Sequence, residues 1–210
     1  MDTMTRYPIP AAPARTEMVV RGSRFIAQAI PTSTVEAARA AIAAVRAEMP
    51  DATHHCYAYL IGYGASTVAG MSDDGEPAGT AGRPMMAVLR GANLGDITVI
   101  VTRYFGGTLL GVGGLVRAYS DATRAVLAIV PRTQRVTYRY ITLHVPYADY
   151  TMIRRLLEAN AAVIIDETFA AAITMTIGLP ADQAATISKQ IDEYSAGRIR
   201  IESAHEHGII

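Results

Sequence analysis

Two short segments hold most of the residues whose types could do chemistry. The first, residues 72–84, reads SDDGEPAGTAGRP and combines three carboxylates with three glycines and two prolines. This composition favours a loop over a helix or strand. Backbone N–H groups at glycines and at the start of a helix near Pro84 could bind an anion. The loop residues that we single out are Ser72, Asp73, Asp74, Gly75, Glu76, Pro77, Gly79, Thr80 and Gly82.

Two other interpretations of this acidic segment stay open. Asp73, Asp74 and Glu76 could together hold a hard cation such as Mg²⁺, which prefers carboxylate oxygens. The same composition is also typical of a surface loop with ordinary turn chemistry. The sequence does not distinguish a ligand loop from a structural one.

The second segment, residues 102–119, reads TRYFGGTLLGVGGLVRAY, a strand end, a glycine-rich loop and a helix start. This order resembles a phosphate cradle, but a dinucleotide fingerprint would need glycine at Val116 and a P-loop would need lysine at Val112. We therefore do not expect nucleotide binding by either route. Close packing of strand and helix is the alternative reason for the glycines, which are Gly106, Gly107, Gly111, Gly113 and Gly114.

Three arginines flank the two segments. If the segments lie side by side, Arg83, Arg103 and Arg117 could converge on one anionic ligand. The aromatic residues beside them could stack on bases, as in grooves that bind single-stranded nucleic acid; these are Tyr104, Phe105 and Tyr119. Alternatively, the arginines pair with the acids of the first segment.

His54, His55 and Cys56 suggest a nucleophile or a metal ligand set. Alternate residues of a strand share a face, so His54 and Cys56 could meet. A buried, inert cysteine is the plainer interpretation. Cys56 is the only cysteine, which excludes an internal disulfide and any multi-cysteine metal site. The Gly-x-Ser-x-Gly motif of serine hydrolases is absent.

The elements that position these residues alternate between strands and helices. The β-branched run 97–104 predicts a strand buried on both faces. Ser33 and Glu36 form a capping-box pattern that predicts the start of a helix ending at Pro50. The other elements expected in the first half are strands over 18–20, 25–30, 55–63 and 68–71, a short helix from Pro84, and a loop over 105–114 followed by a helix over 115–130.

The second half has the order β-α-β-β-α-β, which is the ferredoxin-like split motif. The elements lie at 138–145, 149–160, 163–168, 171–179, 182–194 and 198–203. We expect an α+β protein of two domains, residues 1–135 and 136–210. The first carries 13 arginines against 10 acids and the second 6 basic against 9 acidic residues, within a net charge of zero. Neither half has the charge of a broad nucleic-acid surface.

The two segments resemble the signature stretches of the YigZ/IMPACT family. Further matching stretches are IPAAP at 9–13, SRFIA at 23–27 and VRAEMPDATHHCYAY at 45–59. The resemblance covers both halves and is closest to the bacterial branch. It implies a first domain like domain 2 of ribosomal protein S5 and a ferredoxin-like second domain. It implies no known enzymatic activity, and eukaryotic relatives regulate translation.

From these observations we expect a non-enzymatic protein that binds RNA or the ribosome and takes part in regulation of translation. Arg83, Arg103, Tyr104 and Arg117, with the glycines of the second segment, would form the site. We expect no cofactor. The alternative is a Mg²⁺-dependent hydrolase or transferase acting on a small phosphorylated or peptidic substrate. A protein partner could bind the acidic second domain. With no signal sequence or membrane span, we expect a cytoplasmic protein.

Overall fold

The computed structural model describes residues 5–209 of the 210-residue chain, and the side chains of residues 5–202. The chain divides into two compact units. One unit is Tyr7–Gln134, and the other runs from Arg135 onward and includes Thr5 and Arg6. Each unit has hydrophobic clusters of its own, so each is described separately.

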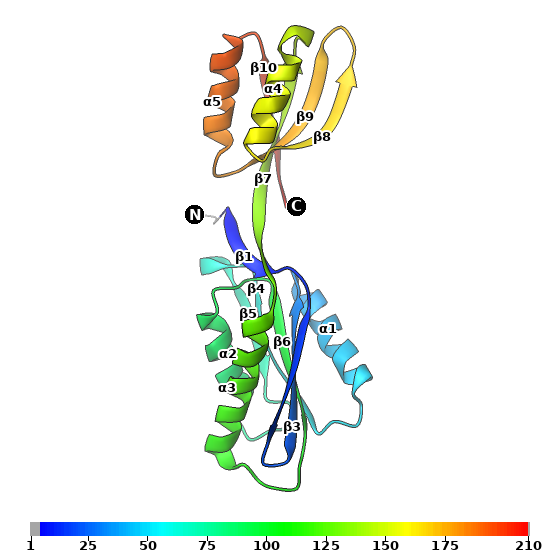
Figure 1. Cartoon of the computed structure of the whole chain (residues 1–210), viewed down its shortest axis with the longest axis vertical. Helices are drawn as coiled ribbons and strands as arrows, with labels where there is room; N and C mark the ends of the chain where they lie inside the picture. Colours follow the sequence, from blue (N-terminus) through cyan, green and yellow to red (C-terminus); the bar gives the residue numbers. More distant parts are fainter. Residues whose placement is uncertain (1–4, 210) are drawn as a thin grey trace. The chain divides into compact units, whose positions relative to one another are not determined.

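A five-stranded antiparallel sheet forms the centre of the first unit (Figure 1). Its middle strand, β6 (Ile97–Tyr104), is buried at every position except Tyr104, as its β-branched sequence predicts. The strand order is β2 (Ala14–Val20), β3 (Ser23–Pro31), β6, β4 (His54–Ile61) and β5 (Val68–Ser72). A short 3-10 turn, η1 (Gly64–Ser66), lies between β4 and β5.

Helices cover both faces of this sheet (Figure 1). Because side chains of a strand alternate between faces, Val99 packs in one cluster and Ile100 in another. The cluster of Ile100 includes Ile42 and Val45 of α1 (Val35–Glu48). The cluster of Val99 is formed with α2 (Gly82–Gly91) and α3 (Gly111–Ile129). The acidic segment leads into α2 and the glycine-rich segment leads into α3. Both segments therefore lie on the face of the sheet that α2 and α3 cover.

In the first unit, two predicted helix starts are wrong. The N-cap of α1 is Thr34, whose hydroxyl accepts a hydrogen bond from the N–H of Ala37 at 3.1 Å, so the capping box at Ser33 and Glu36 is one residue out of register. Serine and threonine are both favoured at N-caps, so two neighbouring residues of these types leave the first helical residue uncertain by one position. Helix α3 begins at Gly111 rather than at 115, so the loop after β6 is shorter than predicted.

The second unit has the predicted ferredoxin-like fold. Its strands pair in the order β10-β7-β9-β8, all antiparallel. Two helices bury one stripe each against the sheet, through Ile153 and Leu157 of the first and Ile187 and Ile191 of the second. The elements are β7 (Arg132–Val145), α4 (Tyr147–Ala159), β8 (Val163–Phe169), β9 (Ile173–Pro180), α5 (Ala184–Ser195) and β10 (Arg200–Ile209), and β1 (Arg6–Pro10) pairs with β7.

Within the described part of the chain, none of the helices has both the length and the hydropathy that crossing a membrane requires.

Candidate functional site

The acidic segment (72–84) and the glycine-rich segment (102–119) meet in one pocket of the first unit. We call this the signature pocket. Its volume is about 460 Å³. It is lined by Thr53, His54, Gly75, Glu76, Pro77, Arg103, Phe105, Leu109, Leu110, Gly111, Val112 and Leu115. The sequence left open whether the two segments converge, and the structure brings them together.

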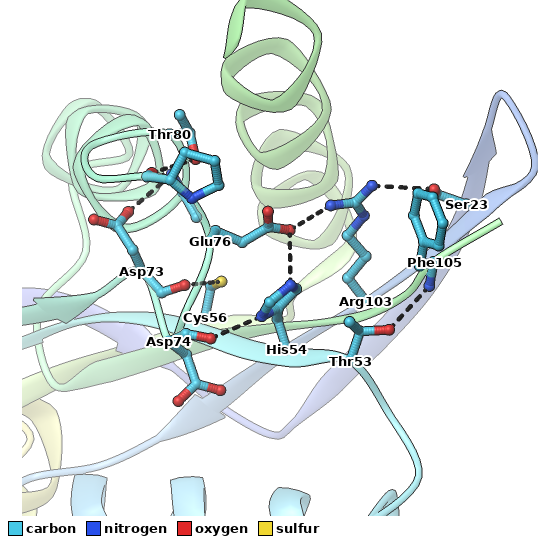
Figure 2. Close-up of polar contacts among 12 residues, drawn as sticks. Ser23, Thr53, His54, Cys56, Asp73, Asp74, Glu76, Thr80, Arg103 and Phe105 are labelled. Carbon is cyan, nitrogen blue, oxygen red and sulfur yellow. Dashed lines mark hydrogen bonds and ion pairs between the residues drawn. The ribbon is translucent and has the colours of Figure 1, made fainter. Parts of the chain in front are cut away.

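The floor of the signature pocket contains a buried ion pair. Arg103 and Glu76 are 5% and 7% exposed, and Nη1 of Arg103 donates to Oε1 of Glu76 at 2.6 Å (Figure 2). The hydroxyl of Tyr119 donates to the same oxygen at 2.7 Å, and Nη2 of Arg103 donates to the hydroxyl of Ser23 at 3.2 Å. Arg103 is therefore a neutralised, buried cation and not a free binder of phosphate.

His54 lies beside this pair with a defined tautomer. Its Nδ1 is 2.8 Å from the carbonyl oxygen of Asp74, which can only accept a hydrogen bond, so Nδ1 carries the hydrogen (Figure 2). Nε2 lies 3.9 Å from Oε1 of Glu76, beyond hydrogen-bond distance. The imidazole of His54 thus lies beside the pocket floor, with its Nε2 nearest to the carboxylate of Glu76.

Cys56 lies on the same strand as His54 and has the properties of an inert thiol. It is fully buried, and its Sγ donates to the carbonyl oxygen of Asp73 at 2.9 Å (Figure 2). Burial raises the pKa of the Cys56 thiol to about 12. Because the thiolate is the nucleophile, the structure does not support the nucleophile interpretation of residues 54–56.

Apolar side chains form the rim of the signature pocket. Phe105, Leu109 and Val112 are 47%, 82% and 65% exposed. The ring of Phe105 also contacts the floor, since its centroid lies 5.7 Å from Cζ of Arg103. A buried polar floor below an exposed apolar rim is typical of a binding pocket for a partly apolar, partly polar group.

The three carboxylates of the acidic segment do not form a cation site. Asp73 accepts from the N–H groups of Gly79, Ala81 and Gly82 at 2.8, 3.0 and 2.8 Å. Asp74 pairs with Arg46 and accepts from the N–H of His55. Glu76 belongs to the floor of the signature pocket. Among the side chains of residues 5–202, no group of three His, Cys, Asp or Glu residues could hold a metal ion. These partners do not support the Mg²⁺ interpretation of this segment.

Asp73 also occupies the place in which the sequence predicts an external anion. Burial opposes its ionisation, but the three N–H donors outweigh burial and lower the pKa of its carboxyl group. These donors stand at and before the start of α2, where backbone N–H groups lack partners within the helix. The anion at this helix end is the chain's own carboxylate, so the acidic segment is a cap for α2.

The three arginines do not converge. Only Arg103 of the three lines the signature pocket. Arg83 is exposed on the first turn of α2. The Arg117 side chain is 86% exposed, 3.8 Å from the carboxylate of Asp121. Arg117 lines a separate pocket of about 490 Å³, together with Arg21, Gly113 and Gly114.

Two of the three expected stacking residues are also engaged elsewhere. Tyr119 is fully buried, so it cannot stack on a base. Tyr104 donates to Asp51 at 3.1 Å, and the guanidinium of Arg24 lies over its ring. Phe105 alone of the three is an exposed aromatic side chain that lines the signature pocket.

Comparisons with known proteins place the chain among its relatives. The model described as "Impact N-terminal domain" matches residues 21–127, and "Domain of unknown function (DUF1949)" matches residues 143–198. "IMPACT family member YigZ" of Escherichia coli (strain K12) is 40% identical over 204 residues, 97% of this chain and 100% of that protein. The chain belongs to the IMPACT family.

Two further matches cover nearly the whole chain. An "IMPACT family member" of Haemophilus influenzae is 36% identical over 200 residues, 95% of this chain and 97% of that one. A crystal structure of a hypothetical protein is 40% identical, covers 97% of this chain and 99% of its own, and has a TM-score of 0.67. The Impact N-terminal match includes every residue of the signature pocket.

The glycines of this IMPACT family protein have different roles. A Cβ on Gly106 would lie 1.9 Å from the carbonyl carbon of Gly22, so Gly106 serves close packing, as the structural interpretation predicts. Gly107 and Gly111 have φ of +82° and +71°, a region that side-chain-bearing residues rarely adopt. Gly113 meets no atom within 4 Å and has no such requirement.

Sequence reasoning did not assign Thr53, Leu109 or Val112 to the site, although all three line the pocket. The residue types at Leu109 and Val112 could have indicated a place at the site. Large apolar side chains within a glycine-rich loop do not serve turn geometry and are candidates for a binding rim.

Proposed function

We propose that this IMPACT family protein is a non-enzymatic binding protein for RNA, free or in the ribosome, and that it acts in the regulation of translation. The signature pocket and the arginines beside it would form the binding face. The observation that carries the proposal is the exposed rim of Phe105, Leu109 and Val112 above a floor whose charges are already paired. Such a rim suits stacking and burial of a base better than chemistry on a substrate.

Cations for the RNA backbone lie next to this rim. Arg21 and Arg117 line the neighbouring pocket, which shares Leu110 with the signature pocket. Arg21 is exposed and Arg117 is held only by a long contact with Asp121, so both guanidinium groups can meet phosphates. A site with two such cations agrees with a net charge of zero, because it needs few phosphate contacts.

The link to translation rests on the family. Eukaryotic members regulate translation, and such an analogy sets an expectation that only binding data can test. No observation favours the hydrolase or transferase alternative, since the three carboxylates of the acidic segment and the thiol of Cys56 have partners within the protein.

Co-sedimentation with ribosomes over a salt series tests the proposal. We expect the wild-type protein to pellet at low salt and to be released as salt rises. The Arg21→Ala/Arg117→Ala protein should bind more weakly and with a shallower salt dependence, by about 0.7 to 0.9 in slope per lost phosphate contact. Arg103→Ala is not a suitable variant, because it leaves the buried carboxylate of Glu76 without its partner.

The matched control removes the same charge elsewhere. Arg39 of α1 and Arg155 of α4 are both exposed, and α1 covers the opposite face of its sheet. Arg39→Ala/Arg155→Ala should pellet like the wild type. Failure of the wild type to pellet at low salt, or equal pelleting of the two double variants, would refute the proposed face.

A further inference from the structure

We propose that the groove between α2 and α3 of the first unit binds an acidic amphipathic helix of a partner protein. The two helices lie side by side on one face of the sheet (Figure 1), and the groove between them has a volume of about 700 Å³. The groove shares no lining residue with the signature pocket or with the pocket of Arg21 and Arg117. It is therefore a second surface, which the proposed RNA binding does not use.

Each helix contributes one stripe of side chains to the groove. In α2 and its C-cap, the lining positions follow helical spacing, at Pro84, Ala87, Val88, Gly91 and Ala92. In α3 they are Val116, Ser120, Arg124, Leu127 and Ala128. The stripe of α3 extends for about 18 Å at 1.5 Å per residue, so the groove has room along its length for about three turns of a third helix.

The walls of the groove determine the conformation of its occupant. Both walls are helices, whose backbone N–H and C=O groups bond within the helix, so the groove offers no strand edge to which an extended peptide could add. A segment that lies there must satisfy its own backbone groups, as an α-helix does. Ala87, Gly91 and Ala128 are small and exposed, which lets the axis of a third helix come close.

The lining of the groove suits apolar side chains rather than bases. Val88, Val116 and Leu127 line it, and none of its lining residues is aromatic. Because bases stack on aromatic faces, this lining favours a protein over RNA. Ser120 is the one uncharged polar side chain of the lining. It is 8% exposed, and its hydroxyl takes part in none of the hydrogen bonds that the side chains of residues 5–202 form, so it is available to one polar side chain of the occupant.

Arginines give the groove its charge. Its two charged lining residues are Arg124 and Arg132, both exposed. Nη1 of Arg132 donates to the carbonyl oxygen of Ala92 at 3.3 Å, which places this arginine at the C-terminal end of α2. Arg124 pairs with Asp121 at 2.6 Å, but these side chains are 61% and 42% exposed, so water weakens the pair. Helix α2 holds two arginines and no acid, α3 two arginines and one acid, and α1 two of each. This excess of arginine is complementary to carboxylates on the partner helix.

Selection from a display library of helical peptides against the immobilised full-length chain tests the proposal. Each peptide has about 16 residues, with apolar side chains at i, i+3, i+4 and i+7 and with glutamate or lysine at equal frequency beside them. Shuffled versions of the same peptides, which lack the apolar stripe, form the other half of the library. We expect the enriched peptides to keep the apolar stripe and to carry glutamate rather than lysine.

Two variants separate the space in the groove from its charge. Ala87→Gln fills part of the groove without a change of charge and should weaken binding of an enriched peptide at least about tenfold, because the new side chain collides with the peptide. Arg124→Gln/Arg132→Gln should weaken binding about 3- to 10-fold and make it less sensitive to salt. Fluorescence anisotropy with the labelled peptide measures both effects.

The matched controls lie away from the groove. Ala44→Gln on α1 adds the same side chain as Ala87→Gln, and Arg39→Gln/Arg155→Gln removes the same charge as the arginine variant; all three positions are exposed. Both controls should bind the peptide like the wild type. Thermal unfolding followed by circular dichroism verifies that each variant is folded.

Several outcomes would overturn the proposal: no enriched peptide, enrichment of lysine-bearing or shuffled peptides, or equal binding by Ala87→Gln and Ala44→Gln. A dimer in sedimentation velocity that Ala87→Gln converts to a monomer would assign the groove to a second copy of the chain instead. Weaker pelleting of Ala87→Gln than of Ala44→Gln with ribosomes would assign it to the RNA-binding face. We expect these two variants to pellet alike, so peptide binding can fail while RNA binding stands.

Discussion

At the scale of single residues, the first unit contains a buried ion pair, between Glu76 and Arg103. Glu76 accepts from both Arg103 and Tyr119, and the chain brings these residues together from three separate elements. A buried ion pair of this kind gives little net stability over apolar residues, but removing one partner leaves a buried charge uncompensated. The pair therefore fixes the geometry of the pocket floor and makes both residues sensitive to substitution.

We expect Arg103→Ala to lower the free energy of unfolding by about 3–5 kcal/mol, because it leaves the Glu76 carboxylate buried without its cation. Urea unfolding measures the change. The control is Arg83→Ala, an exposed arginine, which should change stability by no more than about 0.5 kcal/mol. Equal stability of the two variants would show that Arg103 has no structural role.

His55 gives the stability a pH dependence of defined sign. Burial lowers the pKa of its imidazole, although Asp74 partly opposes this shift. The unfolded chain then takes up a proton below about pH 6.5 that the folded protein resists, so His55 contributes stability above that pH that is lost as the pH falls. We expect the free energy of unfolding to fall between pH 7.5 and pH 5.5 more for the wild type than for His55→Asn. A fall of the same size in both proteins would contradict the assignment.

At the scale of elements, the turn between β2 and β3 packs against the loop after β6. Gly22 and Gly106 meet there, with no space for a side chain at Gly106, and Ser23 accepts from the N–H of Gly106 at 3.2 Å. This contact joins the edge of the sheet to the loop that carries Phe105. The rim of the signature pocket therefore depends on a backbone contact as well as on its own side chains.

We expect Gly106→Ala to destabilise the first unit by roughly 1–3 kcal/mol, because the new methyl group would press on backbone atoms of Gly22 that cannot move independently. Gly113→Ala is the matched control. Gly113 lies in α3 with open space around it, so alanine should leave stability unchanged or raise it by up to about 1 kcal/mol. Thermal unfolding of both variants provides the comparison, and a Gly106→Ala protein as stable as the Gly113→Ala protein would disprove the packing role.

At the scale of the whole molecule, the protein contains two units whose buried clusters share no residue. The clusters of the first unit draw on strands β3, β4 and β6 with helices α1, α2 and α3. The cluster of the second unit draws on strands β7 and β9 with helices α4 and α5. A cavity made in one cluster removes contacts from that cluster alone.

We therefore expect Ile153→Ala, a fully buried position of α4, to reduce stability by about 2–5 kcal/mol in the second unit only. Amide hydrogen exchange should become faster in α4, α5 and β9 and stay unchanged in β6. Leu89→Ala in α2 is the reciprocal variant and should show the opposite pattern. Faster exchange throughout both units after either substitution would mean that they unfold as one.

The elements follow from the sequence because their signals are local. The β-branched run 97–104 forms the buried strand β6, and the alternation at 173–177 forms β9. The order of elements after residue 135 leads to the ferredoxin-like sheet, since few topologies bury two helices on one face. The family, too, can be inferred from the two signature segments. Helix starts are less well determined: Ser33 and Thr34 can both cap, and glycine tolerates both loop and helix.

The partners of the charged groups depend on the tertiary structure. Glu76 meets Arg103 across 27 positions, and Asp73 turns back onto the N–H groups of its own loop. An aspartate that caps a helix and one that binds Mg²⁺ look alike in sequence, because both need only an oxygen near a turn. The fold decides which donor lies within hydrogen-bond distance and which side chains stay exposed. Residue types and local order thus come from the sequence, whereas the neutralised floor and apolar rim of the pocket arise only from long-range packing.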